Sequence, residues 1–413
     1  MISESLRKEA LSLLLDLIRV PTVSPFGEGY EEAIKILREF LDRYSVGTEI
    51  IRVPTDYQSH RCAHVSSKPR YILRGFVDEG GRLWLQLNGH YDVVPGGSGW
   101  TKTSPFEPLV EGDRVYGRGS TDMKGGIVSM ALALVLYAES ARKADCRLDA
   151  VFVPDEEVGG ECGTGYYVET LKARKPDYVI IAEPSSPKYI YIGHRGVLWA
   201  RVKVRGKSAH ASVPWLGVNA FLDAAKLALW LEENYVATIA SVRSSYEYDV
   251  PNAGTPTAMI GGEAGVPGGK VNQVPGEAYF TIDRRLIVEE KTEDVAAELR
   301  AAVATGSKRL GLNGDRVELE IVSVAAPALV PRGNPLSLAL IDEAEKKGLP
   351  RPREAISAGG LDSRYYVEKG ILTVAYGPGV HKLSHSPDEY VNFEEVLKFS
   401  EIYASLPAKL SGS

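Results

Sequence analysis

Histidine and carboxylate side chains follow several short apolar runs of the sequence. His90 and Asp92 come after the apolar residues 83–87, and Glu183 comes after residues 178–182. Ligands of α/β sheets gather beyond the carboxyl ends of the strands, so we expect these side chains to lie close together. A metal-bound His usually donates its second ring proton to a carboxylate, and Asp92 is near enough in sequence to accept it. Taken alone, a His near an Asp at a strand end is more often structural than a ligand.

A glycine-rich turn, residues 117–126, leads into an apolar helical pattern and carries one carboxylate, Asp122, at its centre. A phosphate-binding loop is the obvious alternative for such a turn. It is disfavoured because the Walker spacing is absent and because Asp122 would repel a phosphate at the start of the helix. A carboxylate in this position favours a bridging metal ligand.

Three consecutive acids, Asp155, Glu156 and Glu157, follow the apolar residues 150–154. Acids crowded at the end of a buried strand repel one another and lose hydration unless cations neutralise them. A solvated acidic turn is the ordinary explanation of a charge run. The apolar strand before these acids and the glycines after them favour a metal site instead. One Glu can then bind the ion while its neighbour acts as a base for a bound water.

The remaining candidate histidines differ in their sequence context. His385 stands in the segment His-Ser-Pro-Asp-Glu-Tyr, in the loop after the predicted strand 371–376, and we prefer it as a ligand to His381 four residues earlier. His60 and His64 are also four residues apart, as two ligands on one helical face would be. The prolines and polar residues around that pair predict a loop, so we treat the spacing as coincidence.

The predicted elements suit an α/β domain with a second domain inserted into it. Two N-terminal helices are expected at residues 4–19, with Ser3 as N-cap, and 29–44, because apolar positions recur at helical spacing. Alternating strand and helix patterns then predict a mixed, largely parallel sheet flanked by helices. A βαββαβ order follows, which predicts an inserted α+β, ferredoxin-like unit. The expected domains are residues 1–196 and 326–413 for the first and residues 197–325 for the insertion.

The composition is that of an ordinary globular protein. The chain has 413 residues, 44% of them hydrophobic and 25% charged, with a formal net charge of -6. Lys and Arg are spread along the sequence rather than clustered, which disfavours nucleic-acid binding. Uninterrupted apolar runs stay shorter than the roughly 18 residues of a spanning helix, and the N-terminus does not resemble a signal peptide. We therefore expect a cytoplasmic protein that binds no membrane.

The three cysteines, Cys62, Cys146 and Cys162, are odd in number and far apart in the sequence. This arrangement disfavours a disulfide framework and a cysteine zinc site, so ordinary buried thiols are expected. The chain contains only three Gln and eight Asn, while Arg, Glu and Pro are plentiful. Such a bias is typical of thermophile proteins.

These segments together resemble the family of acetylornithine deacetylase, succinyl-diaminopimelate desuccinylase, aminoacylase and glutamate carboxypeptidase, and the resemblance covers residues 8–404. It implies a zinc-peptidase-like catalytic domain with two divalent ions, zinc first and cobalt or manganese as alternatives. It also implies a lid domain that forms a homodimer. The implied ligands are His90 and Glu183 for one ion, Glu157 and His385 for the other, and Asp122 as the bridge.

The same resemblance assigns roles to the two acids beside these ligands. Asp92 would orient His90, and Glu156 would be the general base. Metal binding lowers the pKa of a water from 15.7 toward about 7, so that metal-bound hydroxide can attack a carbonyl. Glu156 would take the proton of that water and pass it to the leaving nitrogen.

The predicted insertion supplies further positions of the resemblance. His210 matches a lid His that reaches the partner subunit's site and stabilises the oxyanion, although a lone surface His is more often structural. Asn272 and Arg285 match positions that bind the substrate carboxylate, a task for which the planar guanidinium is suited. Gly360 lies in a segment that resembles a substrate-site loop. Arg284 is expected to form a surface salt bridge.

The residues and the resemblance together predict a metal-dependent hydrolase. The expected substrate is the amide bond of an N-acyl amino acid, of the acetylornithine or succinyl-diaminopimelate type. A dipeptidase or carboxypeptidase of the same family is the alternative, because a methylene in a specificity pocket changes binding by only about 1–3 kcal/mol. A non-catalytic binding protein is disfavoured because every expected ligand and base position is filled.

Overall fold

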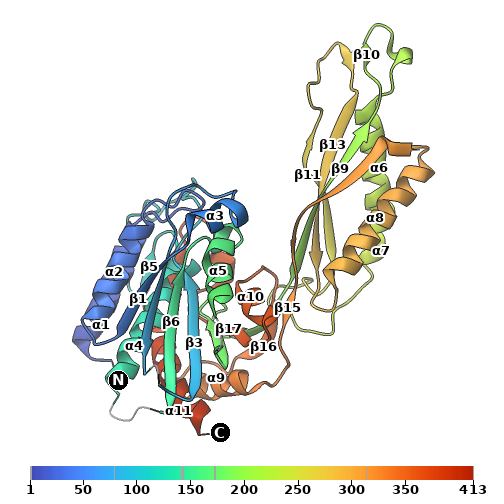
Figure 1. The fold of residues 1–413 in the computed structure, drawn as a ribbon. Coiled ribbons are helices and arrows are strands. Elements are labelled where there is room, and N and C mark those ends of the chain that lie inside the picture. The colour runs from blue at the N-terminus through green and yellow to red at the C-terminus, as the bar shows by residue number, and fades with distance from the viewer. Residues whose placement is uncertain (1, 79, 141–143, 172–173, 313, 413) are drawn as a thin grey trace. The chain divides into compact units, whose positions relative to one another are not determined.

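The chain divides into two compact units, of which unit 2 is inserted into the sequence of unit 1 (Figure 1). The computed structural model describes residues 2–78, 80–140, 144–171, 174–312 and 314–412. Unit 1 comprises Met1–Ile192, Val330–Ala355 and Leu361–Ser413. Unit 2 comprises Gly193–Leu329 and Ile356–Gly360.

Unit 1 contains a mixed sheet whose strands follow the order β1-β2-β6-β3-β7-β17-β8. The strands are β1 Gly47–Arg52, β2 Tyr71–Val77, β3 Leu83–His90, β6 Cys146–Val153, β7 Tyr178–Ile181, β8 Tyr189–His194 and β17 Leu372–Ala375. The central strands β6, β3, β7 and β17 pair in parallel, whereas β1, β2 and β8 pair antiparallel with their neighbours. The predicted fold class is confirmed, although the sequence pattern does not predict β1 and β2.

Helices cover both faces of this sheet, which is why the central strands are apolar throughout. Every residue of β3 after Leu83 is buried, as expected for a parallel strand between two helical layers. One face carries the helices α1 Glu4–Arg19, α2 Tyr30–Asp42, α4 Gly125–Ala138 and α11 Phe393–Ser411 (Figure 1). The other face carries α3 Thr55–Arg61, α5 Tyr166–Thr170 and α10 Ser363–Glu368. The two predicted N-terminal helices and the Ser3 N-cap, which accepts a hydrogen bond from Leu6 N, are confirmed.

The helix α4 is apolar around its whole circumference because it lies in the core. Within the part of the chain that the structure describes, Ser120–Ala138 is the one helical stretch long and apolar enough to cross a membrane, with a mean hydropathy of 1.2. Of that window, 83% is buried inside the protein. It therefore has the character of a core helix.

Unit 2 has the βαββαβ order predicted from the sequence. Its main elements are β9 Gly196–Arg205, α6 Ala220–Leu231, β11 Thr257–Gly265, β13 Glu277–Leu286, α8 Thr292–Arg309 and β14 Val317–Ala325. The four strands are antiparallel in the order β11-β13-β9-β14, and α6 and α8 pack on one face (Figure 1). Because the helices cover one face only, buried residues alternate with exposed or partly exposed ones along the whole of β13.

One prediction about the segment after β1 is wrong. A loop was expected around His60, but residues 55–61 form helix α3 directly after Pro54. Proline is tolerated at the start of a helix because its missing N–H has no intrahelical partner there. The imidazoles of His60 and His64 contact different main-chain oxygens. His60 Nδ1 lies 2.7 Å from Asp56 O, and His64 Nε2 lies 3.0 Å from Val158 O, so the spacing of the two histidines is coincidence, as expected.

The prediction of three free thiols is also wrong. Cys62 and Cys162, 100 residues apart, form a disulfide with a Cα–Cα distance of 6.1 Å. Helix α3, which ends next to Cys62, packs against the segment after β6 that carries Cys162, and this contact cannot be seen in sequence spacing. Cys146 is free and buried, as expected.

Candidate metal centre

The strand ends of unit 1 bring predicted ligands to one edge of the sheet. His90 is the last residue of β3, Glu157 lies in the turn that follows β6, and Glu183 follows β7 by two residues. These three strands are adjacent and parallel, so their carboxyl ends meet at the same edge. Residues distant in the sequence therefore become neighbours.

Two loops add the remaining predicted ligands. Asp122 lies in the irregular turn Ser120–Lys124, directly before α4. His385 lies just after the short helical turn His381–Leu383, in a left-handed backbone conformation with φ of 63°. Neither residue belongs to a strand, so hydrogen bonds of the loops must fix their positions.

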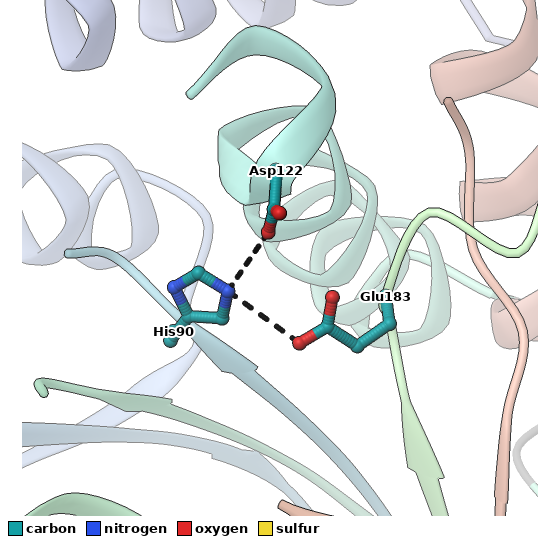
Figure 2. A group of neighbouring side chains, drawn as sticks. All are labelled: His90, Asp122 and Glu183. Atoms are coloured by element: carbon teal, nitrogen blue, oxygen red, sulfur yellow. Dashed lines mark hydrogen bonds and ion pairs between the residues drawn. The ribbon is translucent and has the colours of Figure 1, made fainter. Parts of the chain in front are cut away.

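The ligand atoms form two groups that share Asp122. One group is His90, Asp122 and Glu183, the other is Asp122, Glu157 and His385, and within each group the atoms lie within 4.8 Å of one another. His90 Nε2 lies 3.1 Å from Asp122 Oδ1 and 3.4 Å from Glu183 Oε1 (Figure 2). His385 Nε2 lies 3.5 Å from Asp122 Oδ2 and 2.9 Å from Glu157 Oε2. The two oxygens of Asp122 thus face different groups, which is the geometry of a bridging carboxylate.

The two groups differ in their exposure to solvent. The side chains of His90 and Glu183 are 1% and 7% exposed, whereas that of His385 is 52% exposed. A small molecule that approaches unit 1 from solvent can therefore reach the group of His385 directly.

The buried acids of the site resist ionisation. Burial raises the pKa of Glu156 well above its usual value, and the charges of Asp362 and Glu183 add to the rise. Burial raises the pKa of Glu157 to about 7, and the neighbouring Asp122 contributes. Burial also raises the pKa of Glu183. Positive charge at this place would stabilise all three carboxylates, and divalent cations supply it.

The same acids favour the protonated form of both imidazoles. Hydrogen bonds to Asp122 and Glu157 raise the pKa of His385 to about 10. Burial alone would lower the pKa of His90, but Glu183 and Asp122 raise it well above its usual value. A metal binds the neutral imidazole, so protons and cations compete for these ring nitrogens.

The donor set fits two divalent ions of the zinc type. Each group offers one imidazole nitrogen, one terminal carboxylate and one oxygen of the shared carboxylate. Three protein ligands per ion leave a position for water or substrate, as a catalytic zinc site requires. Nitrogen and oxygen donors of this kind also suit cobalt and manganese.

Asp92 connects the end of β3 to the acidic turn. Its Oδ1 accepts a hydrogen bond from Glu156 N at 3.1 Å and its Oδ2 accepts one from Glu157 N at 3.3 Å. His90 Nδ1 lies 2.9 Å from the main-chain oxygen of Asp92 and 3.4 Å from its carboxylate Oδ1. Asp92 therefore holds the imidazole mainly through its carbonyl, and its carboxylate holds the turn.

Asp155, the first of the three consecutive acids, belongs to neither ligand group. Its carboxylate accepts hydrogen bonds from Arg70 Nε and Tyr30 OH, both at 2.7 Å, and all three side chains are buried. This network anchors the acidic turn to α2 and to the residue directly before β2. The sequence carries no signal for it, because Tyr30 and Arg70 are far from Asp155 along the chain.

The segment that contains Gly360 contributes to the site through its later residues. Gly360 belongs to unit 2, but Asp362 and Arg364 belong to unit 1. Arg364 and the Tyr365 hydroxyl both donate hydrogen bonds to the carbonyl of Gly159, in the acidic turn. Asp362 is 1% exposed, and burial raises its pKa. In the sequence, the polar residues after the pair Gly359-Gly360 were the signal that could have identified Asp362 and Arg364 as part of the site.

His210 and Asn272 lie together in unit 2. His210 pairs with Gln273 in a short antiparallel ladder, and its Nδ1 lies 2.7 Å from Ser212 Oγ. Asn272 is exposed, and its main-chain oxygen accepts a hydrogen bond from Ala211 N at 2.9 Å. The two candidates thus lie on adjoining segments of that unit.

The neighbouring arginines of β13 point to opposite faces of the sheet. Arg285 is partly exposed and forms two hydrogen bonds to Asp283, at 2.7 and 2.9 Å. The prediction that Arg284 forms a salt bridge on the surface is wrong, because this arginine is buried. Its side chain is 0% exposed, pairs with Glu290 and donates to Tyr235 OH at 3.0 Å, because the strand alternation turns it toward the helices.

Comparisons with known proteins identify the family and the fold of this chain. The sequence profile of peptidase family M20/M25/M40 matches residues 86–409. The succinyl-diaminopimelate desuccinylase of Alkalilimnicola ehrlichii is 30% identical over 340 residues, which cover 78% of this chain and 83% of that protein. An M20 family metallo-carboxypeptidase from Sulfolobus solfataricus has a TM-score of 0.75 at 22% identity, covering 98% of this chain and 99% of the other. A dipeptidase from Saccharomyces cerevisiae has a TM-score of 0.76 at 16% identity, covering 99% and 97%.

The matched region spans most of unit 1 and includes both ligand groups, from His90 to His385. The solved structures are similar over nearly the whole length of this chain, so the two-unit fold is shared with them. The chain belongs to peptidase family M20/M25/M40 and is a metal-dependent hydrolase.

Proposed function

We propose that the protein hydrolyses the amide bond of an N-acyl amino acid at a centre of two divalent ions, zinc in preference to cobalt or manganese. The observation that carries this proposal is the position of Asp122, whose two oxygens face two separate imidazole and carboxylate groups. His90 and Glu183 would hold one ion, and Glu157 and His385 the other. Ions bound there would polarise the scissile carbonyl and lower the pKa of a water.

Glu156 is our candidate for the proton transfer. It belongs to neither ligand group, yet it directly precedes the ligand Glu157 and its main-chain nitrogen is held by Asp92. Burial raises its pKa, and the positive charge of two bound ions would lower that pKa again, so that an ionised Glu156 could accept a proton from water and release it to the leaving nitrogen. Asp92 would keep both the acidic turn and His90 in place.

The substrate class rests on chemistry and on the relatives. Arg285 and Asn272 of unit 2 are our candidates for binding the substrate carboxylate, for which Arg285 would exchange its contacts with Asp283. His210 would donate a hydrogen bond to the developing oxyanion, and Gly360 would offer its main chain. The desuccinylase relative favours an N-acyl amino acid. The carboxypeptidase and dipeptidase structures keep a peptide substrate as the second candidate.

A substrate panel tests this proposal. Acetyl and succinyl derivatives of ornithine, diaminopimelate and other amino acids would be assayed beside dipeptides, each with zinc, cobalt or manganese. We expect the best N-acyl amino acid to exceed the best dipeptide in kcat/KM by about tenfold or more, equivalent to about 1.4 kcal/mol of transition-state binding. Faster cleavage of dipeptides would favour the second candidate. A protein with two bound ions that cleaves neither class would contradict the proposal.

We also propose a cytoplasmic homodimer formed through unit 2. Its helix α6 exposes Phe221, Leu222 and Leu229 at 52%, 51% and 63%, and Trp215 nearby is 76% exposed. Exposed apolar groups in such number mark a protein interface. Sedimentation should give twice the chain mass of 44.9 kDa, and L229E should shift the species toward the monomer. A wild-type monomer would contradict this assembly. Disulfides do occur in intracellular proteins of hyperthermophiles, and the composition of this chain is of the thermophile type, so the bond of Cys62 and Cys162 agrees with a cytoplasmic location.

A further inference from the structure

We propose that Arg118 and Glu389 are positioning residues that hold the loop of Asp122 against the loop of His385 and thereby set the affinity for the second ion. The second ion is the one bound by Asp122, Glu157 and His385, so this inference rests on the proposed function. Neither Arg118 nor Glu389 is a candidate ligand, and both are nearly inaccessible, at 2% and 0% exposed.

Glu389 fixes the main chain that carries the bridging carboxylate. Its Oε1 accepts hydrogen bonds from Thr121 N at 3.0 Å and from Asp122 N at 3.1 Å. These amides belong to the irregular turn before α4, where helical hydrogen bonds do not fix the backbone at Asp122. Glu389 therefore fixes the main-chain position from which the side chain of Asp122 extends.

Arg118 joins this acid to the other loop. Its Nη1 donates to Glu389 Oε2 at 2.5 Å and to Ser386 O at 3.3 Å, and its Nη2 donates to His385 O at 3.3 Å. Nη2 also donates to Gly96 O at 3.3 Å. A guanidinium can make these contacts together because its donors are fixed in one plane. One side chain thus connects Glu389 to the main chain of His385.

Burial of the ion pair of Arg118 and Glu389 costs free energy, which argues for a role in positioning. A buried ion pair loses hydration and is often no more stable than apolar residues of the same volume. His90 and Glu183 end or follow strands of the sheet and need no such support. His385 lies in a loop with a left-handed backbone, so its position depends on the contacts of that loop. Residues that orient metal ligands typically change metal affinity by about 10–100-fold when they are replaced.

Metal titration of two variants tests the inference. R118K keeps a positive charge beside Glu389 but cannot donate to Glu389 and to both carbonyls of the other loop. We expect its affinity for the second zinc ion to fall by about 10–100-fold while the first ion stays tightly bound. Competition with a chromogenic chelator and elemental analysis after dialysis would measure this as a change from two ions per chain to one. E389Q should lower the affinity for both ions, because Asp122 belongs to both ligand groups.

A matched control separates position from stability. Arg284 is also a fully buried arginine in an ion pair, but it lies in unit 2 and contacts Glu290. R284K should therefore keep two ions at wild-type affinity. Wild-type affinities for both ions in folded R118K, or equal loss of both ions in it, would overturn the positioning role. A wild-type protein without two ions would instead contradict the proposed function.

Discussion

Replacement of Glu156 by Gln is expected to lower kcat by about 10²–10⁴-fold while two metal ions stay bound. The amide has nearly the same size as the carboxylate but cannot accept a proton from water and deliver it to the leaving nitrogen. Glu156 lies outside both ligand groups, so metal content should not change. The measurement is kcat on the best substrate of the panel, together with elemental analysis of the same preparation.

Glu161 provides the matched control for this variant. It is a partly buried acid five residues further along the same loop, its pKa is raised by burial, and it belongs to neither ligand group. E161Q should therefore keep kcat within about threefold of wild type, since it removes a charge without removing a proton carrier. Near-normal turnover by metal-loaded E156Q would show that another group moves the proton.

Replacement of Asp122 by Ala is expected to remove both ions at once and to lower kcat by at least about 10³-fold. The side chain supplies one oxygen to each group, so its loss leaves each ion with one imidazole and one carboxylate. The charge stabilisation that a metal gives to a hydrolytic transition state amounts to several kcal/mol, and each 1.36 kcal/mol is a factor of ten in rate. Metal content after dialysis and kcat are the two measurements.

A comparison with H385A distinguishes a bridge from an ordinary ligand. His385 belongs to one group only, so H385A should keep one tightly bound ion where D122A keeps none. Burial raises the pKa of Asp122, but its contacts with His385 and His90 outweigh burial and hold that pKa below its usual value. In the metal-free protein the carboxylate therefore stabilises both protonated imidazoles. Metal-free D122A should unfold at a lower temperature than the metal-free wild type, because this charge pairing is lost. Two ions in purified D122A would rule out the bridging role.

The placement of the site follows from local sequence patterns. A strand such as β3, apolar along its whole length, must lie inside a sheet covered on both faces, and a His at its end then lies at the ligand-binding edge. The acids after β6 and β7 follow the same logic, whereas Asp122 and His385 lie in loops and were chosen from the glycine-rich turn and the His-Ser-Pro-Asp-Glu-Tyr segment. The strand pattern does not decide which of Glu156 and Glu157 is the ligand. The resemblance to a family added the pairing of those ligands and the role of Glu156.

Contacts between distant segments had no comparable signal. The disulfide of Cys62 and Cys162 depends on the packing of α3 against the loop after β6, and three scattered cysteines do not reveal it. The pair of Arg118 and Glu389 likewise joins loops that are separated by most of the chain. Arg284 is different, because the strict alternation along β13 could have predicted its burial.

Diffraction from crystals grown with excess zinc, recorded at the zinc absorption edge, tests the two-ion centre most directly. The account predicts two anomalous peaks about 3.5–4 Å apart. One peak should lie among His90, Asp122 and Glu183, and the other among Asp122, Glu157 and His385. Zinc bound only by other residues, or a single ion that does not touch Asp122, would contradict it.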